Sequence, residues 1–389
     1  MKIALPYGNS TLTVEVPDEN LIKVGYISEL EEIKDTEAKI IEHLRNPIGT
    51  PCLSSLVRRG DKVCVIADDY TRPCPDDILL PPLLSELRRG GVKKDDINII
   101  IASGLHQPIP KKLEEIVGKE VLEEYEVIYH NADKSEMVSF GETTRGVPVR
   151  VNKLVGKADF KVSTGFIEPH MFAGFSGGRK SIMPGVSSRE SIYRNHSYEM
   201  LENPNARAGK LKGNPVHEDA LEHAQRVKHN FIVNVILNRD GKISKIVAGD
   251  FIKAHEKGVE MDRKVVEVKF RQKADVTITT NNGYPLDLDL YQTVKGMYTA
   301  STITKRGGYI IVASECREGV GPNSFWKTHR EAESPEKVLE TIRREEPLES
   351  QWENQILAKI QKDKKIYPVS YTHLRAHETR HDLVCRLLL

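Results

Sequence analysis

The chain has 389 residues, 39% of them hydrophobic and 29% charged, which predicts a globular protein with two domains and a sizeable core. Its 57 basic and 56 acidic residues leave a formal net charge of +1, and this balance excludes the strongly basic surface of a nucleic-acid- or membrane-binding protein. No apolar run approaches a membrane span, and the N-terminal stretch MKIALPYGNS lacks the apolar core of a signal peptide, so we expect a cytoplasmic protein. The five scattered cysteines form no CxxC pair, which argues against a zinc or disulfide framework.

The first half of the chain predicts strands that alternate with helices. Residues 61–69 form a continuous apolar strand, 75–91 a helix that ends at two glycines, and 95–108 a strand that runs into a loop. Further strands are expected at 157–170 and 231–238. Because buried strands joined by helices pair in parallel, we predict an α/β fold with mainly parallel sheets.

The same pattern begins again near residue 270. A strand is expected at 273–285, a helix at 288–308, a strand at 309–319, a serine-capped helix at 334–345, and a helix and strand at 352–370. We therefore predict an N-terminal α/β domain over 1–268 and a smaller C-terminal α/β domain over 269–368. The end of 369–389, DLVCRLLL, resembles translated sequencing-adaptor read-through, so we expect a non-native tail there and exclude its histidines from the site.

Polar loops follow five of the predicted strands. In parallel α/β sheets, ligands bind outside the carboxyl ends of the strands, so these loops are the candidate site. They are DDYTRP (68–73), SGLHQP (103–108), GFIEPHMFAGFSGGRK (165–180), NNGYPLD (281–287) and ECREGVG (315–321). Asp69 and Arg72 in the first loop are either a solvated charge pair or, for the arginine, a bidentate clamp for a carboxylate or phosphate.

Three histidines lie in or near these loops. Taken singly, His106, His170 and His196 are each as compatible with a structural role as with a functional one. Together they favour proton transfer or metal binding, because imidazole titrates near neutral pH and its neutral form ligates metals.

The segment around Lys180 is rich in glycine but matches neither the Walker spacing GxxxxGK(S/T) nor GxGxxG. Ser176, Gly177 and Gly178, with a helix expected after Ser181, are either a phosphate-binding loop or a tight bend. Lys180 is then a counter-charge or a nucleophile that forms a covalent link. In the second domain, Gln292 and Lys295 are three residues apart on one helix face, where they are either solvated or in contact with substrate.

Several of these motifs occur together, in order, in one known family. DDYTRPCP, SGLHQP, GFIEPHMFAGFSGGRKSIMPG, NHS, NNGYPLDLDLYQTVKG and SQWENQILAKI resemble the nickel-pincer-nucleotide-dependent lactate racemase family of 2-hydroxy-acid racemases and epimerases. The resemblance extends from the first residues to about residue 368. It implies two α/β domains with the active site in the cleft between them.

The resemblance also implies a cofactor and roles for individual residues. The cofactor is nickel held by pyridinium-3-thioamide-5-thiocarboxylic acid mononucleotide, which cofactor-synthesis enzymes supply and which is covalently attached to Lys180. His196 is implied as the metal ligand, and His106 and His170 as the acid/base pair. The implied cofactor contacts are Asp69, Arg72, Ser176, Gly177 and Gly178; the implied substrate contacts are Arg72, Tyr291, Gln292, Lys295 and Trp352.

The chemistry implied is racemisation of a small-molecule 2-hydroxy acid by hydride removal through a planar 2-keto acid, which avoids a carbanion beside a carboxylate. Gln107, where arginine is expected, and the loop 315–326 depart from a lactate enzyme and leave the substrate's side chain open. One alternative is a non-catalytic protein that binds phosphate, a nucleotide or the nickel cofactor. Another is a metal-dependent hydrolase with His106, His170 and His196 as ligands, which lacks an accompanying carboxylate cluster.

Overall fold

The computed structural model describes residues 1–370, so the predicted non-native tail lies almost entirely outside the described residues. Its contacts divide the chain into two compact units. The large unit contains Ile27–His196 and Glu202–Glu267, and the small unit contains Met1–Tyr26, Ser197–Leu201 and the residues from Val268 onward. One division falls between Glu267 and Val268, whereas the first 26 residues group with the C-terminal residues, because their hairpin hydrogen-bonds to loops there.

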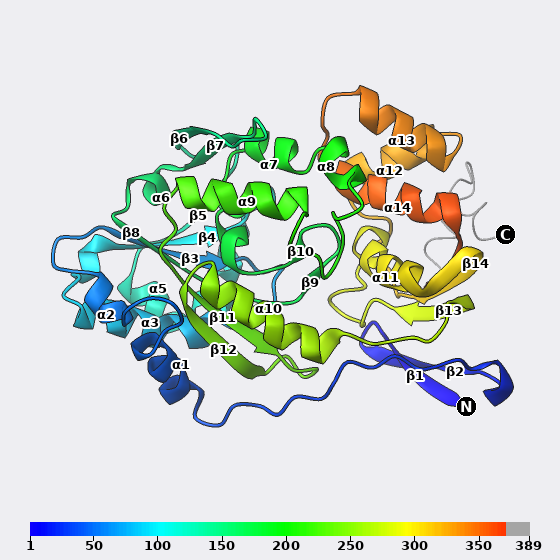
Figure 1. Cartoon of the computed structure of the whole chain (residues 1–389), viewed down its shortest axis with the longest axis horizontal. Helices are drawn as coiled ribbons and strands as arrows, with labels where there is room; N and C mark the ends of the chain where they lie inside the picture. The colour runs from blue at the N-terminus through cyan, green and yellow to red at the C-terminus, as the bar shows by residue number, and fades with distance from the viewer. Residues whose placement is uncertain (371–389) are drawn as a thin grey trace. The chain divides into compact units, whose positions relative to one another are not determined.

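The large unit is built on one sheet with the strand order β12-β11-β8-β3-β4-β5 (Figure 1). All neighbours pair in parallel except the edge strand β12, which is antiparallel to β11. The strands are β3 (Val63–Asp68), β4 (Ile97–Ala102), β5 (Val127–Tyr129), β8 (Phe160–Phe166), β11 (Phe231–Leu237) and β12 (Ile243–Asp250). The mainly parallel α/β fold predicted from the apolar strands is therefore confirmed.

Helices cover both faces of this sheet. Along β3, Val63 and Val65 pack with α1, α2 and α3 on one face, while Cys64 and Ile66 pack with α9 and α10 on the other. Continuous apolar strands are the expected consequence of burial on both faces. The helices are α1 (Thr36–Arg45), α2 (Leu53–Leu56), α3 (Asp76–Arg89), α4 (Leu113–Val117), α5 (Lys119–Glu124), α6 (Lys153–Lys157), α7 (Arg189–Asn195), α9 (Pro215–Arg226) and α10 (Lys253–Val266).

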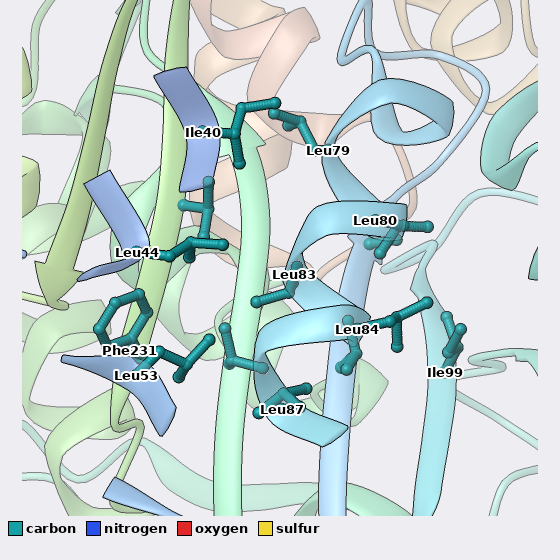
Figure 2. Packing of buried hydrophobic residues seen from close by; sticks show 14 of the residues in the cluster. Ile40, Leu44, Leu53, Leu79, Leu80, Leu83, Leu84, Leu87, Ile99 and Phe231 are labelled. Carbon is teal, nitrogen blue, oxygen red and sulfur yellow. The ribbon is translucent and has the colours of Figure 1, made fainter. Parts of the chain in front are cut away.

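The helix predicted at 75–91 is α3, which supplies much of the large unit's core. Leu79, Leu80, Leu83 and Leu87 recur at helical spacing and are fully buried against neighbouring elements (Figure 2). Burial of each such side chain contributes about 1.5–3 kcal/mol to folding. This core fixes the carboxyl ends of β3, β4 and β8, from which the polar loops emerge.

Two short hairpins and one tight turn complete the large unit. β6 (Met137–Glu142) pairs with β7 (Pro148–Asn152), and β9 (Pro169–His170) pairs with β10 (Gly174–Phe175). The helix expected to begin after Ser181 is wrong: Gly178–Ser181 form a single 3-10 turn, and the next α-helix is α7. Between this turn and α7 the backbone forms hydrogen bonds typical of turns, for example from the N–H of Gly185 to Lys180 O at 3.0 Å.

The small unit holds a parallel three-stranded sheet in the order β13-β14-β15. Its strands are β13 (Ala274–Thr280), β14 (Thr304–Ala313) and β15 (Lys365–Val369), and its helices are α8 (Tyr198–Glu202), α11 (Leu290–Ile303), α12 (Asn323–Glu331), α13 (Pro335–Arg344) and α14 (Gln351–Asp363). An N-terminal hairpin pairs β1 (Lys2–Tyr7) with β2 (Ser10–Glu15). The predicted serine cap is present, because Ser334 Oγ accepts the backbone N–H of Lys337 at 3.3 Å.

One predicted boundary in this unit is wrong. The helix expected over 288–308 ends at Ile303, and β14 begins at Thr304. The segment TKRGG joins the strand because parallel pairing links Ala274 to Thr304. Among residues 1–370, no helix is long and apolar enough to cross a membrane.

Candidate functional site

The loops after β3 and β4 bring Asp69 and His106 into direct contact. Asp69 Oδ2 lies 2.6 Å from Nδ1 of His106, and Thr71 Oγ1 donates to Asp69 Oδ1 at 2.6 Å. Because an ionised carboxylate only accepts hydrogen bonds, Nδ1 carries the proton and the lone pair of the neutral ring is on Nε2. The Asp69 carboxylate is buried, whereas the His106 side chain is 43% exposed.

Electrostatics keep Asp69 ionised. Its burial opposes ionisation, but the hydrogen bond and charge of His106, together with the charge of Arg72, outweigh burial and hold the pKa of Asp69 below its usual range. The resulting carboxylate stabilises a positive charge on His106. A histidine with its tautomer fixed by a buried carboxylate is suited to accept a proton at Nε2.

Two carboxylic acids near the end of β3, Asp68 and Asp76, were not singled out from the sequence. Asp76 Oδ2 accepts the backbone N–H of Asp68 at 3.1 Å. Burial raises the pKa of Asp68 to about 7, and burial followed by the charge of Asp68 raises the pKa of Asp76 well above its usual range. In sequence these residues look like a strand end and a helix first turn, so the pattern gave no signal for a shared buried site.

Phe172 gathers three of the predicted site residues. Its ring centroid lies 4.6 Å from that of His170, 5.0 Å from that of His196, and 5.9 Å from Nζ of Lys180. The phenyl ring is almost fully buried, so it is a fixed support for all three groups. Phe172 could not be singled out from the sequence, because a phenylalanine within HMFAGF is indistinguishable from an ordinary core residue.

His170 is held by the β9–β10 hairpin. His170 and Gly174 pair across this hairpin, and the backbone N–H of Ala173 donates to His170 Nδ1 at 3.2 Å. Because Nδ1 accepts, the proton of the neutral ring is on Nε2. In this arrangement His170 presents a donor, whereas His106 presents an acceptor.

His196 ends α7 and is oriented by its neighbour. Its Nδ1 lies 2.8 Å from Oδ1 of Asn195, whose amide nitrogen donates to Asp219 Oδ2 at 2.7 Å. The amide is therefore fixed with its oxygen toward His196, which places the imidazole lone pair on Nε2. Burial, and secondarily the charge of Lys180, lowers the pKa of His196 to about 3, so the ring is neutral and suited to ligate a metal.

Lys180 lies in the 3-10 turn that follows β10. Burial, with the charges of Arg72 and Arg179, lowers the pKa of Lys180 well below its usual value. A neutral amine is a nucleophile, whereas an ammonium ion is not. Burial and the neighbouring positive charges therefore favour the neutral amine more than in an exposed lysine, and the choice between nucleophile and counter-charge remains a prediction.

Arg179 beside it is a structural support that the sequence did not reveal. Its guanidinium is 1% exposed and donates to Ala173 O at 2.7 Å and to Gly177 O at 3.3 Å. His255 Nε2 lies 3.2 Å from Arg179 Nη1 and 2.9 Å from Ser176 O. These bonds hold the 173–178 backbone in one shape.

Two backbone N–H groups of the glycine loop have protein partners, and the cofactor contacts implied for Ser176, Gly177 and Gly178 remain predictions. The N–H of Gly178 donates to Asn234 Oδ1 at 2.8 Å, and that of Ser176 donates to Glu168 O at 2.9 Å. The Ser176 hydroxyl donates to Phe166 O at 2.8 Å. Cβ atoms at Gly177 and Gly178 would lie 2.7 Å from Asn234 Oδ1 and His255 Cγ, and both glycines have positive φ, so packing and backbone conformation explain them.

The remaining predicted residues belong to the small unit. Lys295 Nζ donates to Gln292 Oε1 at 2.8 Å, so the two residues lie on one face of α11 as expected. The ring of Tyr291 packs edge-on against Phe325, with centroids 5.4 Å apart. Trp352 is half-buried in the first turn of α14.

The described residues offer few protein donors for a metal. Within residues 1–370, no group of three or more His, Cys, Asp and Glu side chains is arranged to hold a metal ion. Among these described residues, His106, His170 and His196 therefore do not form a common ligand set. This geometry argues against the metal-dependent hydrolase.

Comparison with known families covers most of the chain. Residues 7–209 match the lactate racemase N-terminal domain, and residues 269–383 match the lactate racemase C-terminal domain. The lactate racemase of Thermoanaerobacterium thermosaccharolyticum is 39% identical over 379 residues, which cover 95% of this chain and 88% of that protein. The chain belongs to the lactate racemase family. It is an isomerase of that family, as its resemblance in sequence predicted.

Other relatives agree with this membership. The lactate racemase of Lactiplantibacillus plantarum is 38% identical over 372 residues, covering 92% of this chain and 86% of that protein. The apoprotein structure of the T. thermosaccharolyticum lactate racemase is similar with a TM-score of 0.89 and 38% identity, covering 96% of this chain and 89% of that one. A Thermotoga maritima protein shares the fold, with a TM-score of 0.67 at 19% identity over 93% of this chain and 92% of that one.

Proposed function

We propose that this member of the lactate racemase family racemises or epimerises a 2-hydroxy carboxylic acid, lactate or a related acid, with a nickel-pincer mononucleotide attached to Lys180. The observation that carries the proposal is the grouping of Lys180, His170 and His196 around the ring of Phe172. One loop and the helix that follows it thereby supply an attachment point, a proton-transfer group and a metal ligand.

The residues fit such a cofactor. Lys180 has the lowered pKa that favours a neutral, nucleophilic amine, and His196 offers one oriented Nε2 lone pair. A single protein ligand suits a metal whose other donors arrive with an organic group, whereas a metal held by protein alone needs three or four. When bound, the cofactor supplies a hydride acceptor for the substrate carbon. Cofactor-synthesis enzymes would be the partners that provide it.

His106 is the better placed base for the substrate hydroxyl. Its Nε2 lone pair accepts the hydroxyl proton, and the Asp69 carboxylate at Nδ1 stabilises the imidazolium that results. Partial exposure of His106 leaves room for a small hydroxy acid to approach.

His170 is the complementary donor. Its Nε2–H can hydrogen-bond the oxygen on C2 and polarise the keto acid for reduction. Action of His170 as a base requires release of the Ala173 N–H from Nδ1 and a change of tautomer. The two histidines are therefore poised differently: His106 starts with its lone pair on Nε2, whereas His170 has to change tautomer before it accepts a proton there.

The substrate carboxylate needs fixed positive charge. Arg72 is suited to bind it because a guanidinium pairs with a carboxylate through two parallel hydrogen bonds. Lys295 adds a point charge, and its bond to Gln292 Oε1 limits its motion. Tyr291 and Trp352 remain proposed contacts for the substrate's remaining surface.

The test is a panel of single-enantiomer 2-hydroxy acids, given to protein co-expressed with the cofactor-making enzymes and analysed by chiral chromatography. Intact mass should show an adduct on Lys180, and at least one acid should racemise. Lys180→Arg should lose both the adduct and the activity, while Lys253→Arg, an exposed lysine in the same unit, should keep both. An adduct-bearing, nickel-loaded protein that racemises none of the acids would support a cofactor carrier instead.

A further inference from the structure

Asp287 is a buried carboxylate that the proposed chemistry does not use. It lies in the loop NNGYPLD between β13 and α11 and is 1% exposed. A buried carboxylate is costly unless it is well hydrogen-bonded, so its partners indicate what it does.

Its partners come from two other segments of the small unit. Asp287 Oδ2 accepts the backbone N–H of Gly8 at 2.7 Å and that of Glu315 at 2.9 Å. Gly8 lies in the turn of the N-terminal hairpin, and Glu315 lies near the start of the loop after β14. One oxygen atom therefore joins three segments that are far apart in sequence.

The loop after β14 then runs beside the start of α11. Backbone bonds link Cys316 N–H to Asp287 O at 2.9 Å and Glu318 N–H to Leu288 O at 2.9 Å. They continue with Leu290 N–H to Gly319 O at 3.0 Å and Tyr291 N–H to Val320 O at 3.2 Å. The position of the first turn of α11 is thus set by this ladder, which begins at Asp287.

The hairpin turn is fixed from its other side as well. Gly8 O accepts the N–H of Tyr284 at 2.9 Å, and Pro6 O accepts the Thr280 hydroxyl at 2.6 Å. Gly8 has a φ of +52°, and a Cβ there would overlap the Glu315 carboxylate. The turn is therefore hydrogen-bonded to both loops and has a backbone conformation that favours glycine.

The element that this assembly holds carries proposed substrate contacts. Asp289 Oδ1 caps α11 by accepting the N–H of Gln292 at 2.7 Å, and Gln292 in turn bonds Lys295. We propose that Asp287 is a positioning residue that locks the N-terminal hairpin and the 315–321 loop around the first turn of α11, so that Gln292 and Lys295 are fixed for substrate binding. This inference rests on the proposed function for the role of Gln292 and Lys295.

The charge of the Asp287 carboxylate strengthens this arrangement. Its Oδ2 accepts two N–H donors at once, and the negative charge strengthens both bonds. An asparagine of the same size can place its amide oxygen at this point, but that neutral oxygen accepts the N–H groups of Gly8 and Glu315 more weakly than a carboxylate does. Asp287→Asn therefore changes the hydrogen bonding while keeping the volume.

The experiment compares Asp287→Asn with Asp275→Asn in the complete, cofactor-loaded protein. Asp275 is a matched control, since it is an exposed carboxylate of the same unit whose partner is Lys305. We expect Asp287→Asn to raise KM for the racemised acid roughly tenfold, with a smaller change in kcat and an unchanged Lys180 adduct. Asp275→Asn should match the unsubstituted protein.

Hydrogen exchange of the cofactor-free protein gives a readout that does not depend on activity. In Asp287→Asn, amide exchange should accelerate in peptides covering residues 3–9 and 288–295 but not across β13–β15. If those peptides keep their exchange rates, or if KM is unchanged while kcat falls, the positioning role is refuted. A protein that racemises no acid refutes the proposed function, and the exchange data still decide whether Asp287 fixes α11.

A second substitution covers the case in which Asp287→Asn does not fold. Gly8→Ala leaves the carboxylate intact but strains the hairpin turn, because a residue with a side chain rarely adopts a φ of +52°, and it should accelerate exchange in the same two peptides. Unchanged exchange in this variant would also contradict the proposal.

Discussion

Asp69 Oδ2 and His106 Nδ1 lie 2.6 Å apart although the two residues are separated by 37 positions in sequence. Parallel pairing of β3 with β4 brings them together, because both residues follow the carboxyl ends of adjacent strands. The contact fixes the tautomer of His106 and supplies the charge that stabilises its protonated form.

Asp69→Asn is expected to lower kcat about 10- to 100-fold, because the amide removes the charge that stabilises a protonated His106. KM should change less, and the Lys180 adduct should remain. Steady-state kinetics on the racemised acid measures this, with Asp240→Asn in an exposed turn of the same unit as the control. Equal kcat values for Asp69→Asn and the control would show that the pair is structural.

Alanine substitutions of the three site histidines should differ in how much nickel the protein retains. His196→Ala should lose bound nickel, because its Nε2 is the proposed protein ligand, whereas His106→Ala and His170→Ala should retain nickel and lose activity about 100-fold or more. Metal analysis of the desalted, cofactor-loaded proteins makes the comparison. Nickel loss in His106→Ala or His170→Ala would favour a site in which histidines alone hold the metal.

Phe172→Leu should reduce activity while leaving the fold intact. Leucine keeps an apolar side chain, so we expect a loss in unfolding free energy of about 1–2 kcal/mol. The edge contacts that orient His170 and His196 are lost, so kcat should fall about tenfold or more. Chemical denaturation and kinetics measured on one preparation test both parts, and an unchanged kcat would mean that Phe172 serves only the core.

The cofactor-free protein should lose stability in mild acid. Burial lowers the pKa of His196, His223 and His255 to about 3 and that of His130 to about 4, all below the ordinary value near 6.5. Below pH 6.5 the unfolded chain therefore binds protons that the folded chain does not, so stability falls as pH falls. Each such histidine contributes about 1.4 kcal/mol per pH unit until its folded pKa is reached.

Urea denaturation at pH 7.5, 6.0 and 5.0 measures that slope. The lowered pKa of Asp69 acts in the same direction at lower pH, because an ionised, hydrogen-bonded carboxylate stabilises the fold until it is protonated. A free energy of unfolding that is constant between pH 7.5 and 5.0 would contradict burial of these histidines in neutral form.

The sequence predicted the parts of this molecule that follow from periodicity and chain direction. Continuous apolar runs predicted β3, β4, β8 and β11, and their parallel order placed the polar loops at one edge of the sheet. The spacing of Gln292 and Lys295 also predicted that they share a helix face, and they do. These features are local or follow from how parallel strands pair.

Features that depend on tertiary packing could not be predicted in this way. Phe172 and Arg179 support the site residues only once the chain folds back on itself, and the packing of the glycine pair at 177–178 against Asn234 and His255 has no signal in the sequence. The turn at Gly8 has a role only through Asp287, which lies 279 residues away. No local pattern records such contacts.

The central claim is tested most directly by following one enantiomer of the racemised acid in D2O with the cofactor-loaded protein. Chiral chromatography with mass analysis should show an equal mixture of enantiomers whose C2 hydrogen is retained, because a hydride removed from carbon and returned to it does not exchange with solvent. Lys180→Arg should leave the starting enantiomer unchanged. Deuterium at C2 of the product, or racemisation by Lys180→Arg, would contradict the account.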